Sequence, residues 1–444
     1  MKIDNVVTRM APSPTGKFHI GSARTALFSY LFAKHNGGKF ILRIEDTDKE
    51  RSKKEYEENI IESFRWLGLD YDEFYRQSER TEIYKENIKK LIDSGHAYIS
   101  NEEDQNIGVG EHVERITNRL KSVIRFKNPN KKIKFADEIL GGIEFDTTDL
   151  KDFVIAKDLD TPLYHLTVVV DDGLMNVSHV IRAQEHIANT PRQILILEAL
   201  GFKRPIYAHI PLVLAPDKTK LSKRHGAVAL LDYRDEGYLP EAVLNFLAFL
   251  GWNPGTEQEL FNPKELVESF SLEKVNKGGA VFNTEKLNWY NREYIKKMDN
   301  SQVLAEVRKY LTLDEDTLLR ALPSIIERIN KWNDLSDKNE FGFYKNLPEY
   351  DAEKLIWKNS DKEKTISYLQ KTKELLGESD YGSAESIKNS IWEYVESVGR
   401  GDVLWPLRFA LSGKEKSPDP FTLAYIFGKK ESLLRIEKAL EKLS

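Results

Sequence analysis

Hydrophobic and polar residues alternate over the first part of the chain in a pattern that predicts strands joined by helices. Val6–Met10 is a short apolar-rich run that stops before two prolines, which predicts a buried strand. Apolar residues then recur at helical spacing from about Ser22 to Lys34, Phe40–Ile44 predicts a second strand, and Tyr56–Leu67 predicts a second helix. Strands joined by helices in this order form parallel sheets with right-handed crossovers, so we expect a parallel sheet here.

The pattern changes twice further along the chain. From about residue 96 to 163, charge clusters, a glycine pair and short β-prone runs break the alternation and predict an insertion. The alternation resumes at Leu166–Val170 and Val177–Arg182, and a helix follows with Thr190 as its N-cap and a proline in its first position. After Tyr233 amphipathic helices continue to the end. The expected fold is therefore α/β with an α+β insertion, followed by an all-α region.

Composition narrows the class of protein. The chain has 444 residues, 40% of them hydrophobic, which predicts about two to four domains with sizeable cores. No apolar run approaches the roughly 18–20 residues of a membrane span, and the N-terminus lacks a secretory signal. Cysteine is absent, which excludes disulfides and cysteine-ligated zinc. We expect a cytoplasmic enzyme that makes no membrane contact and holds no metal ion in a site of its own.

The net charge of −5 hides one strongly basic stretch. Between Arg115 and Lys134 the chain carries eight cations and no acidic residue. Either a solvated surface or a patch that contacts phosphates would have this composition.

Two short segments carry the chemistry. His19-Ile20-Gly21-Ser22 follows a turn rich in proline and glycine, between a strand and a helix, where backbone N–H groups and the helix dipole can meet a phosphate. Lys220-Leu221-Ser222-Lys223-Arg224 places three cations in a polar loop that could close over a triphosphate. Each alone could be a surface feature, but together they indicate an ATP site at which the α-phosphate is attacked.

These residues resemble those of class I aminoacyl-tRNA synthetases, in particular the bacterial-type glutamyl-tRNA synthetases. HIGS is similar to the family's HIGH signature, and KLSKR is similar to its KMSKS loop. Five longer stretches resemble glutamate-enzyme signatures in the expected order: RMAPSPTGKFHIGSARTALF, GGKFILRIEDTDKERS, YRQSER, TPLYHLTVVVDDGLM and VIRAQEH. LPEAVLNFLAFLGW and GGAVFNTEKLNWYN resemble the segment after the KMSKS loop. The resemblance covers about 1–100 and 150–295, whereas the last third matches by position and helicity.

The resemblance implies a division into five segments. A Rossmann-type catalytic domain would occupy 1–95 and 164–232, with the KLSKR loop in its second half, and an acceptor-end-binding insertion would occupy 96–163. A stem-contact helical region at 233–305 and an all-helical anticodon-binding region at 306–444 would follow. Many relatives carry a zinc knuckle in the insertion, and this chain has no cysteine to build one, so we expect a trimmed, metal-free insertion. The residues expected to contact tRNA there are Arg115, Arg119, Lys121, Arg125 and Lys127.

The implied reaction has two steps. Glutamate's carboxylate attacks the α-phosphorus of ATP, with Mg²⁺ bridging the phosphates, and the glutamyl group then passes to the 3′-terminal adenosine of tRNA-Glu. His19, Lys220 and Lys223 would stabilise the charge that develops on the phosphates and on pyrophosphate. The residues expected around ATP are Gly16, His19, Ile20, Gly21, Ser22, Glu185, His209, Leu221, Ser222, Lys223 and Arg224.

L-Glutamate offers two carboxylates and an ammonium group to a binding site. Planar guanidinium groups match carboxylates bidentately, so Arg9 and Arg182 are expected on the carboxylates, Glu45 on the ammonium and Tyr164 as a further hydrogen-bond partner. The resemblance places these four residues in the glutamate pocket, with Ser13 beside them.

Three alternatives stay open at this stage. The enzyme could charge tRNA-Gln as well as tRNA-Glu, because the residues that read the anticodon cannot be assigned from motifs. A small nucleotidyltransferase with a His-x-Gly-His motif shares part of the signature, but such enzymes lack a long helical tail. A regulatory paralogue with an inactive site is disfavoured because both phosphate segments keep their reactive side chains. We expect a monomer.

Overall fold

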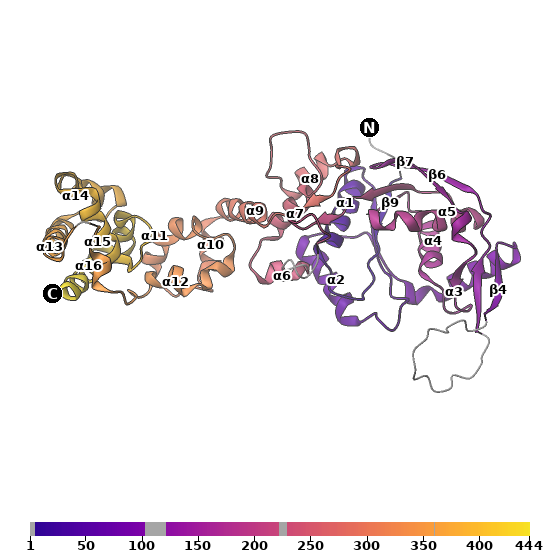
Figure 1. Ribbon diagram of the computed structural model, residues 1–444, viewed down its shortest axis with the longest axis horizontal. Helices are drawn as coiled ribbons and strands as arrows, with labels where there is room; N and C mark the ends of the chain where they lie inside the picture. Colours follow the sequence, from indigo (N-terminus) through magenta and orange to yellow (C-terminus); the bar gives the residue numbers. More distant parts are fainter. Residues whose placement is uncertain (1–4, 103–120, 222–228, 359) are drawn as a thin grey trace, which may run out of the picture. The chain divides into compact units, whose positions relative to one another are not determined.

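The computed structural model describes residues 5–102, 121–221, 229–358 and 360–444. The chain forms two compact units, Met1–Tyr290 and Asn291–Ser444 (Figure 1). The boundary falls within one long helix, α9 (Thr284–Lys297). The predicted segment 233–305 therefore spans both units, and the finer five-part division stays a prediction.

Parallel strands joined by helices open the first unit, as the periodicity predicts. β1 (Val7–Met10), β2 (Lys39–Ile44) and β3 (Glu73–Arg76) pair in parallel in the order β1-β2-β3. Helices α1 (Ile20–His35) and α2 (Lys54–Leu67) connect them, and Gly68 ends α2 in a left-handed conformation.

The second half of this sheet comes from residues far along the chain. β9 (His179–Ala183) and β10 (Ile206–Ile210) pair in parallel and are joined by α5 (Thr190–Ala199). The backbone N–H of Ser178, just before β9, donates to the carbonyl of Val7, which places β1 beside β9. From the neighbouring strands β1 and β9 the chain continues in opposite directions across the sheet, to β2 and to β10. Such a switch point creates a crevice at the carboxyl ends of the strands.

The structure makes one detail of the predicted second half specific and corrects another. The apolar run Leu166–Val170, at which the alternation of helices and strands resumes, lies in helix α4 (Tyr164–Leu174). The N-cap of α5 is Asn189, one residue before the predicted Thr190.

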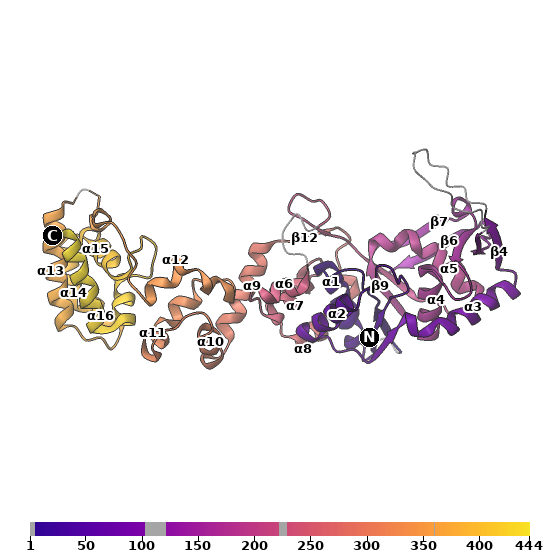
Figure 2. The same ribbon diagram turned by 90° about the horizontal axis from the view of Figure 1, so that it is seen from below.

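The region predicted as an insertion contributes to two sheets (Figure 2). β4 (Ala97–Glu102), β5 (Lys121–Phe126) and β8 (Phe153–Ala156) form an antiparallel sheet of their own, preceded by α3 (Thr81–Asp93). β6 (Lys132–Asp137) and β7 (Gly141–Asp146) form a hairpin that extends the catalytic sheet, because β6 pairs with β10. The insertion is thus partly continuous with the catalytic sheet.

Short helices and one small sheet complete the first unit. These elements are β11 (Val213–Leu214), α6 (Leu230–Asp235), α7 (Pro240–Phe249), α8 (Pro263–Ser269) and β12 (Ala280–Val281). β11 pairs with β12 in parallel, and α1 packs against α7 and α8 as well as against β1. Because α1 is covered on most sides, its start is held firmly at the carboxyl end of β1.

Every regular element described in the second unit is helical. Its helices are α10 (Asn300–Val307), α11 (Glu315–Ile326), α12 (Lys338–Phe341), α13 (Lys362–Glu378), α14 (Ala384–Val398), α15 (Arg400–Ser412) and α16 (Pro420–Leu443). α16 contains the predicted helix at Glu431–Leu443 and bends at Gly428, whose φ is 71°. The all-α character of the C-terminal region is confirmed.

Candidate active site

A cavity of about 970 Å³ lies at the carboxyl ends of the strands in the first unit. Arg9 and Arg182 reach it from the ends of β1 and β9, which are the strands at the switch point. Its volume is at the upper end of the range for small-molecule sites, which suits a ligand as large as a nucleotide plus an amino acid.

Most of the residues predicted for ATP and glutamate line this one cavity. They are Arg9, Ser13, Gly16, His19, Ile20, Gly21, Ser22, Glu45, Tyr164, Arg182, Glu185, Lys220 and Leu221. The structure thus brings together residues as far apart in sequence as Arg9 and Leu221.

His19 stands at the N-terminus of α1 as its N-cap. Its Nδ1 accepts a hydrogen bond from the backbone N–H of Ser22 at 3.2 Å, and its Nε2 lies 3.0 Å from Ser22 Oγ. Burial among protein atoms lowers the pKa of His19, so the ring is neutral near pH 7. With Nδ1 accepting, the proton lies on Nε2 and is directed at Ser22 Oγ. A phosphate that takes the place of this hydroxyl as acceptor can bind the Nε2–H together with the open end of the helix.

Lys220 approaches His19 from the middle of the chain. Its Nζ lies 2.6 Å from Glu185 Oε2, and this bond lowers the pKa of Glu185. Lys220 and Glu185 are close enough to His19 to shift its pKa in opposite directions. Beyond the undescribed residues 222–228, Ala229 forms a β-bridge with His19. Ala229 therefore lies beside the start of α1, and Lys220 and Leu221 line the same cavity as His19.

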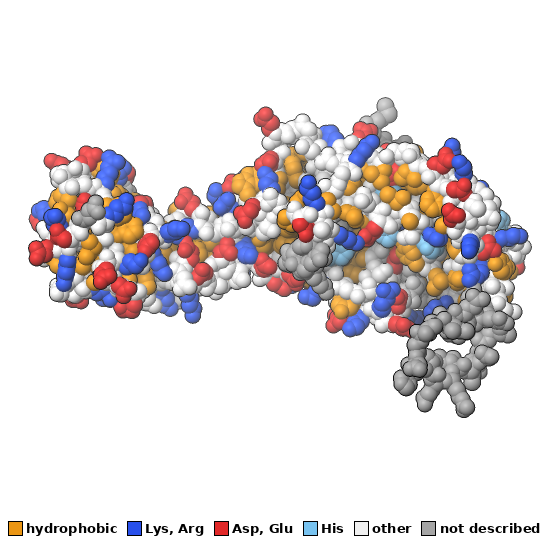
Figure 3. All heavy atoms as spheres, viewed as in Figure 1, with side chains coloured by type: hydrophobic (Ala, Val, Ile, Leu, Met, Phe, Trp, Pro, Cys, Tyr) orange, Lys and Arg blue, Asp and Glu red, His pale blue; other side chains and the backbone are white. Residues whose placement is uncertain are grey.

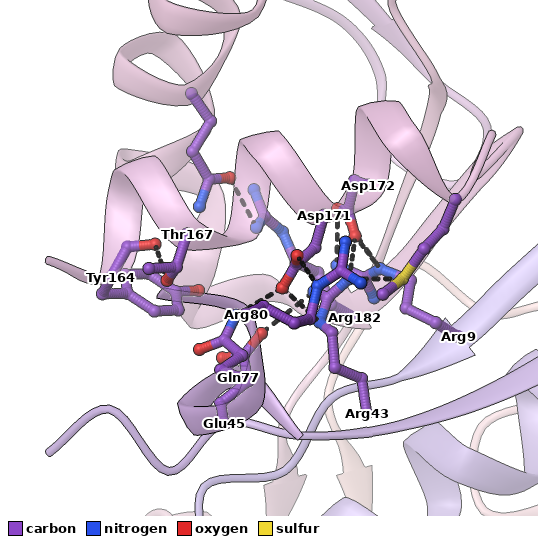
Figure 4. A network of polar contacts seen from close by, with 12 residues as sticks. Arg9, Arg43, Glu45, Gln77, Arg80, Tyr164, Thr167, Asp171, Asp172 and Arg182 are labelled. Atoms are coloured by element: carbon purple, nitrogen blue, oxygen red, sulfur yellow. Dashed lines mark hydrogen bonds and ion pairs between the residues drawn. The ribbon is translucent and has the colours of Figure 1, made fainter. Parts of the chain in front are cut away.

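A buried ion-pair network supports Arg9 on the amino-acid side (Figure 4). Arg9 Nε lies 3.2 Å from Asp172 Oδ1, and Arg43 Nη1 lies 2.8 Å from the same oxygen. Burial opposes ionisation of Asp172, but the two guanidinium groups outweigh it and lower its pKa. The charge of Arg9 is thus already compensated by protein.

Glu45 follows β2 and shares Arg43 with Asp172. Its Oε1 accepts from Arg43 Nη2 at 3.0 Å. Burial nevertheless raises the pKa of Glu45 to about 7, because removing the carboxylate from water outweighs the attraction of Arg43. Glu45 is therefore poised to ionise when a cation such as an ammonium group arrives beside it.

Arg182 differs from Arg9 in having only neutral partners. Its Nη1 donates to Gln193 Oε1 at 2.7 Å, its Nη2 to Thr190 Oγ1 at 2.8 Å, and its Nε to His209 Nε2 at 3.2 Å. The side chain is buried, and burial lowers its pKa. A buried guanidinium whose hydrogen-bond partners among the described residues are all neutral is a strong attractor for an anionic ligand.

Tyr164 begins α4 and faces the same cavity. Its hydroxyl lies 3.2 Å from His186 Nδ1, and burial raises its pKa, so it is a neutral hydrogen-bond group. Burial lowers the pKa of His186 to about 4, so this ring also carries no charge near pH 7.

Several predicted residues are not placed in the cavity. His209 is fully buried in β10 and is not part of the cavity wall; it lies behind Arg182. Ser222, Lys223 and Arg224 lie outside the described residues, and so do Arg115 and Arg119.

Three lysines of the described part of the basic run pair with acidic residues. Lys131 pairs with Glu198, while Lys132 and Lys134 both pair with Glu144. Arg125 lies in β5 and donates to the carbonyl of Asp152 at 2.9 Å, Lys121 begins the same strand, and Lys127 follows it. On the face shown in Figure 3, acidic and basic side chains are interspersed over the described surface.

Sequence reasoning missed the residues behind the arginines. Asp171 and Asp172 lie in an apolar run of α4, and Asp171 accepts from Arg80 Nε and Tyr84 Oη. Two adjacent acids inside an apolar helix are a signal of buried ion pairs that could have been noticed. Their partners among the chain's many arginines could not be chosen from sequence.

The described residues contain no group of three or more His, Cys, Asp or Glu side chains placed to hold a metal ion. Within the same part of the chain, no helix is both long enough and apolar enough to span a membrane.

Comparison with known proteins divides the chain close to the boundary between its two compact units. The model of the family described as "tRNA synthetases class I (E and Q), catalytic domain" matches residues 5–109 and 100–289, and an "Anticodon binding domain" matches 302–440. A protein named glutamate–tRNA ligase from Aquifex aeolicus is 42% identical over 100% of both chains, and one from Petrotoga mobilis is 41% identical over 98% of this chain and 97% of its own.

Solved structures agree with these sequence matches. A glutamate tRNA ligase from Elizabethkingia meningosepticum, in complex with its amino acid, superimposes with a TM-score of 0.88 at 34% identity, over 99% of this chain and 100% of that one. A glutamate-tRNA synthetase from Elizabethkingia anophelis gives 0.87 at the same identity and coverage. Taken with the cavity at the switch point and the helical second unit, these matches show that the chain belongs to the class I tRNA synthetases of the E and Q type.

Proposed function

We propose that this protein is a glutamate–tRNA ligase that activates L-glutamate with ATP and transfers it to the 3′-terminal adenosine of tRNA-Glu. The observation that carries the proposal is the single cavity that joins His19 and Lys220 to Arg9 and Arg182. One end offers donors for phosphate, and the other offers guanidinium groups for carboxylates. A site built this way can hold a carboxylate against a phosphate.

Activation requires positioning rather than a protein base. The α-carboxylate of glutamate arrives ionised, so it can attack the α-phosphorus directly. His19 Nε2–H and the N-terminus of α1 would hold the phosphates in line, and Lys220 would offset charge on the departing pyrophosphate. Lys223, outside the described residues, is proposed to act with Lys220.

Magnesium enters this scheme with the nucleotide. When bound, Mg²⁺ would neutralise phosphate charge, and phosphate oxygens and water would be its main ligands. Glu185, the carboxylate of the cavity wall that pairs with Lys220, is the protein group that would be available to the water ligands of such an ion.

Glutamate is proposed as the amino acid because the pocket holds a buried guanidinium, that of Arg182, whose hydrogen-bond partners are all neutral. Arg182 has neutral partners only, so a bound carboxylate would supply its missing counter-charge. Glutamine would leave that guanidinium facing an amide, which costs a charge-assisted bond and leaves a buried charge unpaired. Glu45 would take the ammonium, and Tyr164 and Ser13 would add hydrogen bonds.

The second unit and the β5 region are proposed to bind tRNA. The match of 302–440 to an anticodon-binding domain supports the first assignment and disfavours a nucleotidyltransferase that acts without tRNA. Arg115, Arg119, Lys121, Arg125 and Lys127 remain the predicted contacts of the acceptor end. The expected cytoplasmic monomer also stays a prediction.

Aminoacylation with labelled glutamate tests the proposal. Purified tRNA-Glu and tRNA-Gln are each incubated with the enzyme, ATP and Mg²⁺, and acid-precipitable label is counted. We expect charging of tRNA-Glu. Equal charging of tRNA-Gln would identify a non-discriminating enzyme, and charging of neither would contradict the proposal.

A further inference from the structure

The orientation of Arg182 depends on an acceptor that only one form of histidine provides. Arg182 Nε lies 3.2 Å from His209 Nε2, and a guanidinium has no acceptor of its own. His209 Nε2 accepts this bond with its lone pair and carries no proton. Thr190 Oγ1 lies 3.1 Å from the same nitrogen, and its hydroxyl can donate to it or to the carbonyl of His186. Arg182 and His209 are partners in the register of β9 and β10, so their side chains lie next to each other on one face of the sheet.

Asp137 fixes that form of the ring. Asp137 Oδ2 lies 2.6 Å from His209 Nδ1, and an ionised carboxylate can only accept, so the proton lies on Nδ1. Burial and Arg182 lower the pKa of His209 even though Asp137 raises it. The ring is then neutral, with its lone pair on Nε2 directed at Arg182.

Asp137 is itself held firmly. It ends β6, and its carboxylate also accepts from the backbone N–H groups of His209, Ile139 and Leu140 at 2.9 to 3.0 Å. Burial opposes its ionisation, but the bond from His209 and these backbone bonds outweigh it and lower the pKa of Asp137. The side chains of Asp137 and His209 are both 0% exposed.

Neither residue belongs to the wall of the cavity. Both can act on a ligand only through Arg182. Asp137 also comes from the hairpin β6–β7, within the segment that interrupts the catalytic domain in sequence.

We infer that Asp137 and His209 are positioning residues for amino-acid recognition: they hold the Arg182 guanidinium in the orientation that binds a carboxylate of glutamate. The inference rests on the proposed function. It adds a series of buried hydrogen bonds that runs from Asp137 in the hairpin β6–β7 through His209 to Arg182 in the amino-acid pocket. It assigns His209 to glutamate recognition instead of the predicted nucleotide contact.

Asp137→Asn is the first test, because it keeps the size of the side chain and removes the charge that holds the ring proton on Nδ1. An asparagine can face Nδ1 with its N–H₂ group, which moves the ring proton to Nε2, where it opposes the N–H of Arg182. We expect the KM for glutamate in aminoacylation to rise about tenfold, with the KM for ATP unchanged within about twofold.

A matched pair at residue 209 separates the two hydrogen bonds. His209→Gln extends an amide oxygen toward the place of Nε2, whereas His209→Asn reaches only the place of Nδ1. We expect His209→Asn to raise the KM for glutamate about tenfold and His209→Gln to recover most of that loss. His179→Gln is the control. His179 is a buried histidine in β9, the strand that carries Arg182, but its ring bonds to Ser178.

Full-length enzyme and tRNA-Glu are used throughout, and circular dichroism verifies folding. If either His209 variant does not fold, Asp137→Asn alone decides. An unchanged KM for glutamate, equal increases for glutamate and ATP, or the same increase in His179→Gln would overturn the inference. Failure of wild-type enzyme to charge tRNA-Glu would instead count against the proposed function.

Discussion

At the scale of single residues, the two arginines of the pocket differ in how their charges are compensated. Arg9 has Asp172 as a buried counter-ion, whereas Arg182 donates only to neutral groups. The sequence predicted both arginines as carboxylate ligands but could not predict this difference. It depends on which of the chain's 71 acidic residues folds beside each arginine.

Removing Arg182 should therefore affect glutamate and spare ATP. We expect Arg182→Ala to raise the KM for glutamate about a hundredfold, because a bound carboxylate loses a buried charged partner. Steady-state aminoacylation with varied glutamate and with varied ATP measures the two KM values separately. Arg192→Ala, which removes an arginine from the neighbouring α5 outside the cavity wall, is the control and should change neither constant. An unchanged KM for glutamate in the Arg182 variant would remove Arg182 from the pocket.

The raised pKa of Glu45 predicts that the binding of glutamate depends on pH. Its pKa of about 7 means that it is largely protonated below that value, and a neutral carboxyl cannot pair with the ammonium of glutamate. The dissociation constant for glutamate should therefore increase about tenfold from about pH 8 to about pH 6, a range in which glutamate's carboxylates stay ionised. Isothermal titration calorimetry measures it. Glu45→Gln should bind weakly with a flat profile, and an equally flat profile for wild type would contradict the assignment.

At the scale of elements, periodicity predicted strands and helices where local pattern and burial agree. β1, β2, α1 and α2 lie within about two residues of their predicted bounds. The pattern of the run Leu166–Val170 did not tell a helix from a strand, because α4 is buried on nearly every side there and no polar face marks a helical period. The pairing of β6 with β10 was missed because pairing between distant segments leaves no local signal.

The turn between α1 and β2 predicts a stability effect. A side chain at Gly38 would place its Cβ 2.2 Å from the carbonyl oxygen of Val6, which is backbone and cannot move aside cheaply. We expect Gly38→Ala to lower the free energy of unfolding by about 1–3 kcal/mol, measured by urea denaturation. Gly142→Ala, with open space around its Cβ, is the control and should not destabilise the protein. Equal stability of both variants would contradict the described packing.

Lys220 and His19 line the same cavity although they are far apart in sequence, which predicts an effect on the rate of ATP–pyrophosphate exchange. Lys220→Ala should slow ATP–pyrophosphate exchange about 10²–10³-fold, because it removes a cation aimed at the developing charge. Lys203→Ala removes an exposed lysine outside the cavity wall and should exchange normally. Near-normal exchange in Lys220→Ala would mean that this lysine does not serve the phosphates.

At the scale of the whole molecule, motifs predicted the family, the α/β first unit and the helical second unit. Every predicted ATP or glutamate residue that the structure describes, except His209, lines one cavity. Several of these residues lie at strand ends, and parallel strand ends meet at one edge of a sheet. The residues that read a tRNA stay unassigned, since surface cations have no distinctive spacing.

The central claim is that one cavity joins glutamate to ATP. ATP–pyrophosphate exchange in the presence of tRNA-Glu measures that step directly, with glutamate and glutamine compared at equal concentration. The account predicts exchange with glutamate and almost none with glutamine. Exchange that is equal for the two amino acids, or absent with glutamate, would contradict it.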